Sequence, residues 1–253
     1  MISRTLRQIV RRIARASGVP PRPSPIPWDV PDRDRSLIAA LTNRRNPYTM
    51  TSPERVYCLI EAVRYVTRCG IQGAIVECGV ARGGSMMAVA STLVRENASD
   101  RDLYLYDTFE GMPRPTEHDK KWNGEPAAKK FARVARGNGS DWCRASIEEV
   151  MRNMQTTGYP ANLCHYVKGS VEQTVPAVMP ARIAILRLDT DWYESTRHEL
   201  HHLYPRVTSG GVLIIDDYGE WQGARRAVDE WLFSGVPILL NRIDTTGRIG
   251  IKQ

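Results

Sequence analysis

The stretch IVECGVARGGS (residues 75–85) contains the features that decide the fold. A short apolar run, typical of a buried strand, leads into a turn with glycines at 79, 83 and 84, and a helix is predicted to continue to about Glu96. At such a strand–turn–helix junction the first N–H groups and the helix dipole can hold a carboxylate or phosphate, and glycines let a ligand approach the backbone. We therefore expect a nucleotide-type cofactor at this turn.

The turn differs from the dinucleotide-binding pattern G-x-G-x-x-G, because Ala81 stands where the second glycine would be. Glu77, just before the turn, would repel a pyrophosphate but could accept a hydrogen bond from an ammonium group. An acid beside an amide-rich turn suits a ligand that carries an amino acid, such as S-adenosylmethionine. Asp107, at the end of the next predicted strand, is expected to bind the ribose hydroxyls, although it could instead cap a turn. Gly169 and Ser170, after the following strand, would lie under the adenine.

Strand-like and helix-like segments alternate on both sides of this turn. Strands are predicted at 74–79, 102–107, 164–169, 183–189, 211–216, 237–240 (PILL) and 248–252 (RIGIK). Helices are predicted to begin at or near Ser52, Gly84, Ser146, Glu194 and Gln222. This alternation predicts an α/β fold, a Rossmann-like doubly wound parallel sheet with helices on both faces.

Two segments depart from the alternation. Residues 1–31 combine a basic amphipathic helical arm with a proline-rich spacer at 18–31, so the folded domain is expected to span 32–253. We expect the arm to be a packing helix of a homo-oligomer, with weak contact to a membrane surface or targeting as alternatives. Residues 111–145 form a long polar insertion after a strand, where open α/β sheets bind ligands. We expect this insertion to be a lid that covers the substrate.

Composition narrows the classes of function. The chain has 253 residues and a formal charge of +7, but five of those charges lie on arginines in residues 1–15, which leaves +2 for the rest. A nucleic-acid partner is therefore not expected. No run of about 18 uncharged apolar residues is present, so no transmembrane helix is expected. The five cysteines are scattered without a C-x-x-C pair, which favours free thiols and a cytoplasmic location.

A second group of motifs places acids at the ends of two neighbouring strands. Asp189 ends one strand within LRLDTDW (186–192), and Asp216 and Asp217 end the next within LIIDDYGEW (213–221). Because the carboxyl ends of parallel strands meet at one edge of the sheet, these carboxylates should converge and raise one another's pKa. Mg²⁺ relieves that repulsion with oxygen ligation. We predict a magnesium site there, although each aspartate alone could be a turn cap.

Four motifs together resemble the macrocin O-methyltransferase family of bacterial sugar methylases. They are ECGVARGGS (77–85), YDTFEGM (106–112), LRLDTDWYEST (186–196) and GGVLIIDDYGEWQGARRAVDE (210–230). The resemblance covers roughly residues 48–253. It implies a seven-stranded class I methyltransferase sheet, S-adenosylmethionine, Mg²⁺, and methylation of a hydroxyl on a deoxysugar of a natural product or nucleotide sugar. The substrate is then a small-molecule glycoside or a nucleotide sugar.

The resemblance also implies roles for individual residues. Matched by position, the expected cofactor contacts are Thr51 (within YTMTS, 48–52), Glu77, Gly79, Gly83, Gly84, Ser85, Asp107, Thr108, Gly169 and Ser170. The expected metal ligands are Asp189, Asp216 and Asp217.

A sugar hydroxyl is a poor nucleophile at neutral pH, and binding to a divalent cation favours its alkoxide. We expect Asp189 to accept the proton because it would touch both metal and substrate. Asp191 is the alternative, because ligation makes Asp189 a weaker base. Trp192 and Trp221 could stack on a sugar face or pack in the core.

Other functions fit parts of the sequence. A catechol-type O-methyltransferase would need the same metal geometry in an aromatic-lined pocket, and the low count of three phenylalanines favours the sugar. A nucleotide-sugar glycosyltransferase shares the acid-x-acid motif at 189–191, but Glu77 and the glycine turn speak against it. The H-E-x-x-H pattern at 198–202, with Glu220 downstream, would suit a zinc protease, yet a solvated helix face explains it better. A non-catalytic binding module would not need three converging carboxylates.

Overall fold

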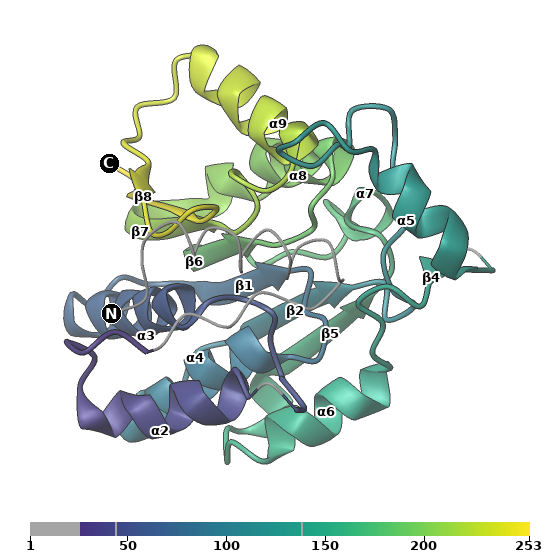
Figure 1. Cartoon of the computed structure of the whole chain (residues 1–253). Helices are drawn as coiled ribbons and strands as arrows, with labels where there is room; N and C mark the ends of the chain where they lie inside the picture. Colours follow the sequence, from purple (N-terminus) through teal and green to yellow (C-terminus); the bar gives the residue numbers. More distant parts are fainter. Residues whose placement is uncertain (1–25, 44, 138) are drawn as a thin grey trace, which may run out of the picture.

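The computed structural model describes residues 26–43, 45–137 and 139–253. A seven-stranded sheet lies between two layers of helices (Figure 1), in the order β5-β2-β1-β6-β7-β9-β8. Its strands are β1 (Ala74–Cys78), β2 (Leu103–Asp107), β5 (Cys164–Lys168), β6 (Ile183–Leu188), β7 (Val207–Ile215), β8 (Asn241–Arg242) and β9 (Arg248–Ile251). The first five strands of that order pair in parallel, whereas β9 is antiparallel to both β7 and β8. The predicted α/β doubly wound fold is confirmed.

Helices cover both faces of the sheet (Figure 1). One face carries α2 (Asp32–Leu41), α3 (Pro53–Arg68), α4 (Gly84–Arg95) and α6 (Ile147–Gln155), and the other carries α7 (Val171–Thr174), α8 (Tyr193–His202) and α9 (Gln222–Phe233). Successive side chains of a strand point to opposite faces. Accordingly Ile75 of β1 packs in the first core, between the sheet and α2, α3, α4 and α6. Val76 and Cys78 pack in the second core, on the opposite face of the sheet. The uninterrupted apolar run that predicted a buried strand therefore reflects two helical layers.

The turn after β1 needs its glycines because other backbone segments pass close to it. A Cβ at Gly79 would overlap the carbonyl oxygen of Asp189, and a Cβ at Gly84 would lie 2.5 Å from the carbonyl carbon of Tyr48. Gly83 caps α4 with φ at +86°, in the left-handed region. The glycine pattern therefore serves the packing of the turn against neighbouring chain segments as well as any ligand.

Several predicted boundaries are confirmed and one predicted strand is wrong. Ser52 caps α3 by accepting the N–H of Arg55, with Pro53 at the first helical position. PILL (237–240) is not a strand: Pro237 has no N–H to donate to a ladder, and Ile238 and Leu240 pack against the second core. The short strand β8 follows it instead. The sequence analysis also missed α2, α5 (Ala127–Val134) and α7, and the hairpin of β3 (Ala135–Arg136) and β4 (Gly139–Ser140).

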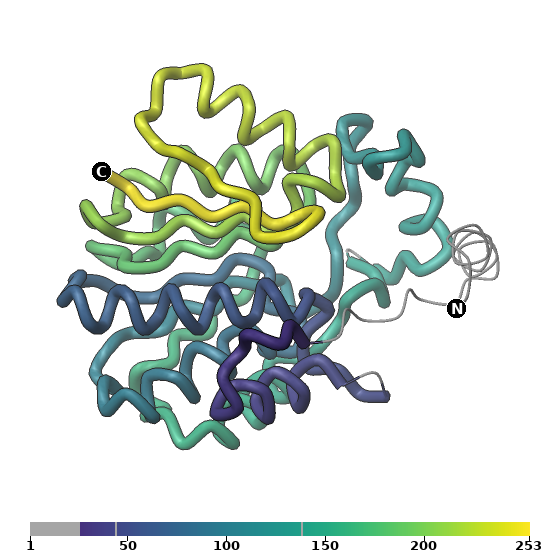
Figure 2. Tube along the Cα trace, turned by 60° about the vertical axis from the view of Figure 1, so that its left-hand side comes forward, coloured from purple at the N-terminus to yellow at the C-terminus, as the bar shows by residue number. Residues whose placement is uncertain are grey.

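The predicted arm and most of the spacer lie outside the described residues, so the arm, its homo-oligomer and the domain boundary stay predictions. The first described helix, α2, begins at Asp32, where the folded domain was expected to start. In the part of the chain that the structure describes, no helix combines the length and the apolar character needed to cross a membrane. Figure 2 shows the segment 111–145 beyond one end of the sheet, beside α9.

A buried ion pair attaches α2 to α3. Asp34 is fully buried, and its two carboxylate oxygens accept from the guanidinium of Arg64 at 2.7 and 2.8 Å. Arg64 donates further to Glu61 at 2.6 Å and to Glu96 at 3.0 Å. The hydrogen bonds that the Arg64 guanidinium donates to Asp34 raise its pKa, although burial acts to lower it.

We predict that Asp34→Ala lowers the free energy of unfolding by about 3 kcal/mol, because it leaves a buried guanidinium without its bidentate partner. Urea unfolding followed by circular dichroism measures this change. Asp32→Ala is the matched control, since Asp32 is fully exposed in the same helical turn and should leave stability close to the wild-type value. Equal losses in the two variants would contradict the role of the buried pair.

Candidate functional site

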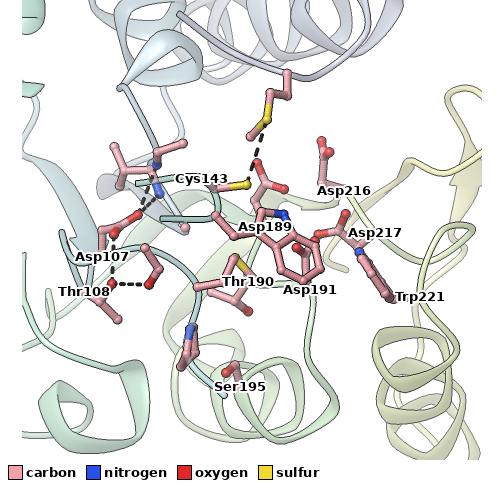
Figure 3. Close-up of a pocket in the computed structure, with 18 of the residues that line it drawn as sticks. Asp107, Thr108, Cys143, Asp189, Thr190, Asp191, Ser195, Asp216, Asp217 and Trp221 are labelled. Carbon is pink, nitrogen blue, oxygen red and sulfur yellow. Dashed lines mark hydrogen bonds between the residues drawn. The ribbon is translucent and has the colours of Figure 1, made fainter. Parts of the chain in front are cut away.

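A cavity of about 370 Å³ opens at the carboxyl ends of the parallel strands, the edge where open α/β sheets bind ligands (Figure 3). Of the predicted cofactor contacts, seven line it: Thr51, Gly79, Ser85, Asp107, Thr108, Gly169 and Ser170. The other three, Glu77, Gly83 and Gly84, are absent from its lining. The structure therefore brings these residues from four sequence segments into one cavity, whereas their roles as ligand contacts stay predictions.

Asp107 holds the glycine turn in place. Its carboxylate accepts the backbone N–H groups of Val80 at 2.8 Å, Ala81 at 3.1 Å and Phe109 at 2.7 Å. Burial raises the pKa of Asp107, and these backbone hydrogen bonds oppose the rise. Asp107 thus makes the turn-capping contacts named as its alternative role, and it also lines the cavity beside Thr108.

Glu77 lies in the core beside the cavity and pairs with an arginine of the next strand. It stands opposite Arg187 in the register of β1 and β6, and the Arg187 guanidinium donates to Glu77 Oε1 at 2.5 Å. Burial raises the pKa of Glu77 to about 8, although Arg187 acts to lower it. Glu77 Oε2 has no hydrogen-bond partner among the described residues. The predicted contact from Glu77 to a ligand ammonium group stays a prediction.

Asp216 is enclosed by two arginines and a threonine. Arg187 and Arg55 both form ion pairs with its carboxylate, and the Thr51 hydroxyl donates to Asp216 Oδ1 at 3.0 Å. Arg55 extends this network to Asp244, at 3.0 Å. Asp216 was assigned to the metal from the sequence. Its carboxylate is instead satisfied by protein partners here, and a metal contact through Asp216 stays a prediction.

A different set of three acids converges in the cavity. Asp189, Asp191 and Asp217 each bring a carboxylate oxygen to within 4.8 Å of the others (Figure 3). Burial, together with the neighbouring carboxylates, raises the pKa of Asp189 to about 6 and of Asp191 to about 7. Burial likewise raises the pKa of Asp217 well above its usual range. The raised pKa values mean that the three carboxyl groups do not readily ionise together. A bound cation would allow all three to ionise.

This set fits a hard divalent cation. All of its ligand atoms are carboxylate oxygens, the donor type that Mg²⁺ prefers. Asp217 Oδ2 is buried and has no hydrogen-bond partner among the described residues. Arg187 neutralises only part of the negative charge of the three carboxylates, because within this set it contacts Asp189 alone, at Oδ2, at 2.6 Å.

The 111–145 segment forms one wall of the cavity. Its Trp142 packs edge-on against Trp192, with ring centroids 5.6 Å apart, and against Trp221 at 5.9 Å. Its Asp119 is fully buried and accepts the N–H of Tyr193 at the start of α8, at 2.9 Å. Trp192 therefore packs in a core cluster, whereas Trp142 and Trp221 also line the cavity. Whether this segment opens and closes as a lid stays a prediction.

The H-E-x-x-H pattern does not assemble a metal site. His198 Nε2 lies 2.9 Å from the carbonyl oxygen of Val175, and Glu199 is buried with its Oε2 on the hydroxyl of Thr190, at 3.2 Å. Over residues 26–43, 45–137 and 139–253, the aspartate set is the single group of three acids, histidines or cysteines that could hold a metal. The expected solvated helix face is wrong at Glu199, which is fully buried, and the absence of zinc stays a prediction.

The sequence analysis missed the basic partners of the site. Arg187 and Arg55 hold the acids, and Lys121, Lys130 and Cys143 of the 111–145 segment line the cavity. For Arg187 a signal was present, because a charged residue inside the apolar run IAILRLD (183–189) must find a buried partner. No comparable signal marks the two lysines, which lie in a polar insertion.

The chain is similar to known proteins in both sequence and structure. Residues 32–249 match the model of a family described as Macrocin-O-methyltransferase (TylF). The chain is 31% identical over 230 residues to the 8-demethyl-8-(2,3-dimethoxy-alpha-L-rhamnosyl)-tetracenomycin-C 4'-O-methyltransferase of Streptomyces olivaceus, covering 89% of this chain and 85% of the relative. It is 32% identical over 186 residues to the demethyldecarbamoylnovobiocin O-methyltransferase of Streptomyces niveus, covering 74% and 68%. The solved structure of the O-methyltransferase NovP matches with a TM-score of 0.73 and 28% identity, over 86% of this chain and 88% of that one.

We predict that the metal-free protein loses stability as pH rises from about 4 to 7, since the folded pKa values of Asp189 and Asp191, about 6 and 7, exceed the ordinary 3.8. A raised folded pKa stabilises the protein below the ordinary value, and this contribution is lost as pH rises through the folded one. Asp191→Asn should reduce that loss by on the order of 1 kcal/mol. Urea unfolding across this pH range tests it, with the exposed Asp141→Asn as control. Parallel pH profiles for Asp191→Asn and the wild type would contradict it.

Proposed function

The chain belongs to the macrocin O-methyltransferase family and is an O-methyltransferase, and on that premise we propose that it methylates a sugar hydroxyl of a small molecule. The proposed donor is S-adenosylmethionine and the proposed metal is Mg²⁺. The observation that carries the proposal is the convergence of Asp189, Asp191 and Asp217 in the same cavity as the glycine turn.

The sugar comes into the proposal from the relatives. The name of the Streptomyces olivaceus relative describes 4'-O-methylation of a rhamnosyl-tetracenomycin, and that relative matches over 85% of its own length. The cavity is consistent with a polar acceptor, because Lys121, Glu172, Ser195 and Glu220 contribute to its lining. A catechol would need a mainly aromatic lining, and Tyr106, Trp142 and Trp221 are the only aromatic residues among the described residues that line the cavity. Glycosyl transfer is no longer an alternative, since the chain is an O-methyltransferase.

The glycine-turn side of the cavity is the proposed cofactor side. Asp107 and Thr108 lie there (Figure 3), and the N–H of Gly169, just after β5, donates to the carbonyl oxygen of Asp107 at 3.0 Å. Ser85 and Ser170 also line the cavity. Ribose hydroxyls would donate to Asp107, whose carboxylate is already oriented by three backbone N–H groups. A carboxylate held in this way loses little freedom when a ligand binds, which favours affinity.

The opposite side is the proposed acceptor side. Asp189, Asp191 and Asp217 would hold the Mg²⁺, which when bound would favour the alkoxide form of a coordinated hydroxyl. Asp189 was the first choice to accept the proton, but Arg187 occupies its Oδ2 at 2.6 Å and lowers its basicity. Asp191 has no such arginine contact among the described residues, so we assign proton acceptance to the carboxylate oxygen of Asp191 that the metal would leave free. Trp142 and Trp221 also line the cavity.

We predict Mg²⁺-dependent methylation of deoxysugar glycosides or nucleotide deoxysugars. The protein is incubated with S-adenosylmethionine and a panel of these acceptors plus catechols, and products are identified by mass spectrometry. A chelator should abolish product formation and added Mg²⁺ should restore it, because the aspartate set needs a cation. Turnover that is indifferent to the chelator would contradict the metal assignment, and preferential methylation of catechols would contradict the sugar.

We predict opposite binding defects for acids on the two sides of the cavity. Asp217→Asn should weaken Mg²⁺ binding by about tenfold or more and leave S-adenosylhomocysteine binding near the wild-type value, because it removes a buried ligand oxygen. Asp107→Asn should weaken S-adenosylhomocysteine by about tenfold and spare Mg²⁺. Titration calorimetry with each ligand measures both variants. Joint loss of the two ligands in either variant would mean that its aspartate is structural.

A further inference from the structure

A second hollow of about 330 Å³ lies beside the cavity already described. It is lined by Trp122, Tyr218, Gly219, Trp221, Gln222, Arg225, Arg242, Thr245 and Arg248. The two hollows share Trp221. A ligand larger than a single sugar that extended across Trp221 would contact both hollows.

The second hollow belongs to the same edge of the sheet as the first. Tyr218 and Gly219 follow β7, and Arg248 begins β9 opposite Ile215, the last residue of β7. The Gly219 N–H donates to the carbonyl of Thr246 at 3.0 Å. Because Thr246 lines the first hollow and Gly219 lines the second, one hydrogen-bonded pair of chain segments forms the boundary between them.

The second hollow is strongly cationic. Arg225 and Arg248 each lie over the ring of Tyr218, at 5.7 and 4.5 Å from its centroid. Arg225 has one acid, Asp229, at 3.4 Å. Within the described part of the chain, Arg242 and Arg248 form no ion pair, and Arg248 donates to the carbonyl oxygens of Thr246 and Gly247. Burial lowers the pKa of Arg248, and Arg242 and Arg225 lower it further, whereas Tyr218 and Asp244 act to raise it.

Like charges gathered in this way cost free energy unless an anion binds between them. Guanidinium groups pair with phosphate oxygens through two parallel hydrogen bonds, and stacking on Tyr218 orients two of the three before a ligand arrives. Trp122 lines the rim of the hollow and is 59% exposed, and an indole ring has a flat aromatic face. Stacking on such a face suits a nucleobase.

We propose that this second hollow binds the diphosphate of a nucleotide sugar whose sugar ring lies in the first cavity. The inference rests on the proposed function, which supplies the sugar, and it selects the nucleotide sugar over the neutral glycoside as acceptor. A neutral glycoside would leave the guanidinium groups of Arg242 and Arg248 without an anionic partner. The diphosphate would accept from Arg225, Arg242 and Arg248, and the nucleobase would lie on Trp122.

The first test compares two acceptors that carry the same sugar, a thymidine diphosphate deoxysugar and the methyl glycoside of that deoxysugar. The wild type should prefer the nucleotide sugar in kcat/KM, mainly through a lower KM. In Arg225→Gln/Arg242→Gln this preference should fall by about tenfold or more, because two charge-assisted contacts are lost. Arg152→Gln, an exposed helical arginine that lines neither hollow, should keep it. Equal use of the two acceptors by the wild type, or an unchanged preference in the double variant, would overturn the proposal.

A second measurement decides the proposal even if neither acceptor is methylated, an outcome that would count against the proposed function alone. Calorimetry with thymidine diphosphate should give a Kd that rises about tenfold or more in the double variant and stays unchanged in Arg152→Gln. Inorganic pyrophosphate is the comparison probe. Trp122→Leu should weaken thymidine diphosphate and spare pyrophosphate. Equal affinity of the wild type for both probes would overturn the nucleotide, and undetectable binding of both would overturn the anion site.

Discussion

The guanidinium of Arg187, buried in the middle of the sheet, is the constraint on which the site depends. It lies on β6 between β1 and β7. It pairs with Glu77 of β1, with Asp189 two residues further along its own chain segment, and with Asp216 after β7. A buried cation requires such partners, and acids packed this closely require a cation. The orientation of Asp189 and Asp216 at the sheet edge therefore follows from one charge in the core.

The same network separates two kinds of acid in the cavity. Asp216 is neutralised by Arg187 and Arg55, so it supports the structure of the edge. Asp191 and Asp217 have no such arginine contact in the described structure, and with Asp189 they form the set that a metal ion would complete. On the cofactor side of the cavity, the carboxylate of Asp107 accepts backbone N–H groups of the glycine turn. The aspartates thus have different roles, and each role depends on which arginine side chains or backbone N–H groups contact the carboxylate.

Much of the fold was predictable because it depends on local pattern. The alternation of apolar runs, glycine turns and helix starts predicted the central strands and most helices, including the Ser52 cap of α3. The prediction was wrong at PILL (237–240), where apolar character came from packing against a helix layer. It also missed α2, whose periodicity is interrupted by charged residues such as the buried Asp34. The short helix α5 was missed because it lies inside the polar insertion, although its own pattern is amphipathic. Hydrophobic periodicity predicts which side of a helix is apolar, but it cannot predict that a charged residue such as Asp34 is buried through an ion pair.

By itself, the sequence determined that the aspartates at 189, 216 and 217 leave neighbouring strands at one edge, beside a glycine turn, because strand direction and helix starts are local properties. Only the tertiary structure decided which carboxylates face one another, since Arg187, Arg55 and Thr51 turn Asp216 aside and Asp191 takes its place in the converging set. It also decided that Arg225, Arg242 and Arg248 share one hollow. Which side chains contact each other depends on their distances in the folded structure, and the sequence gives no direct sign of a contact between residues that are far apart in the chain.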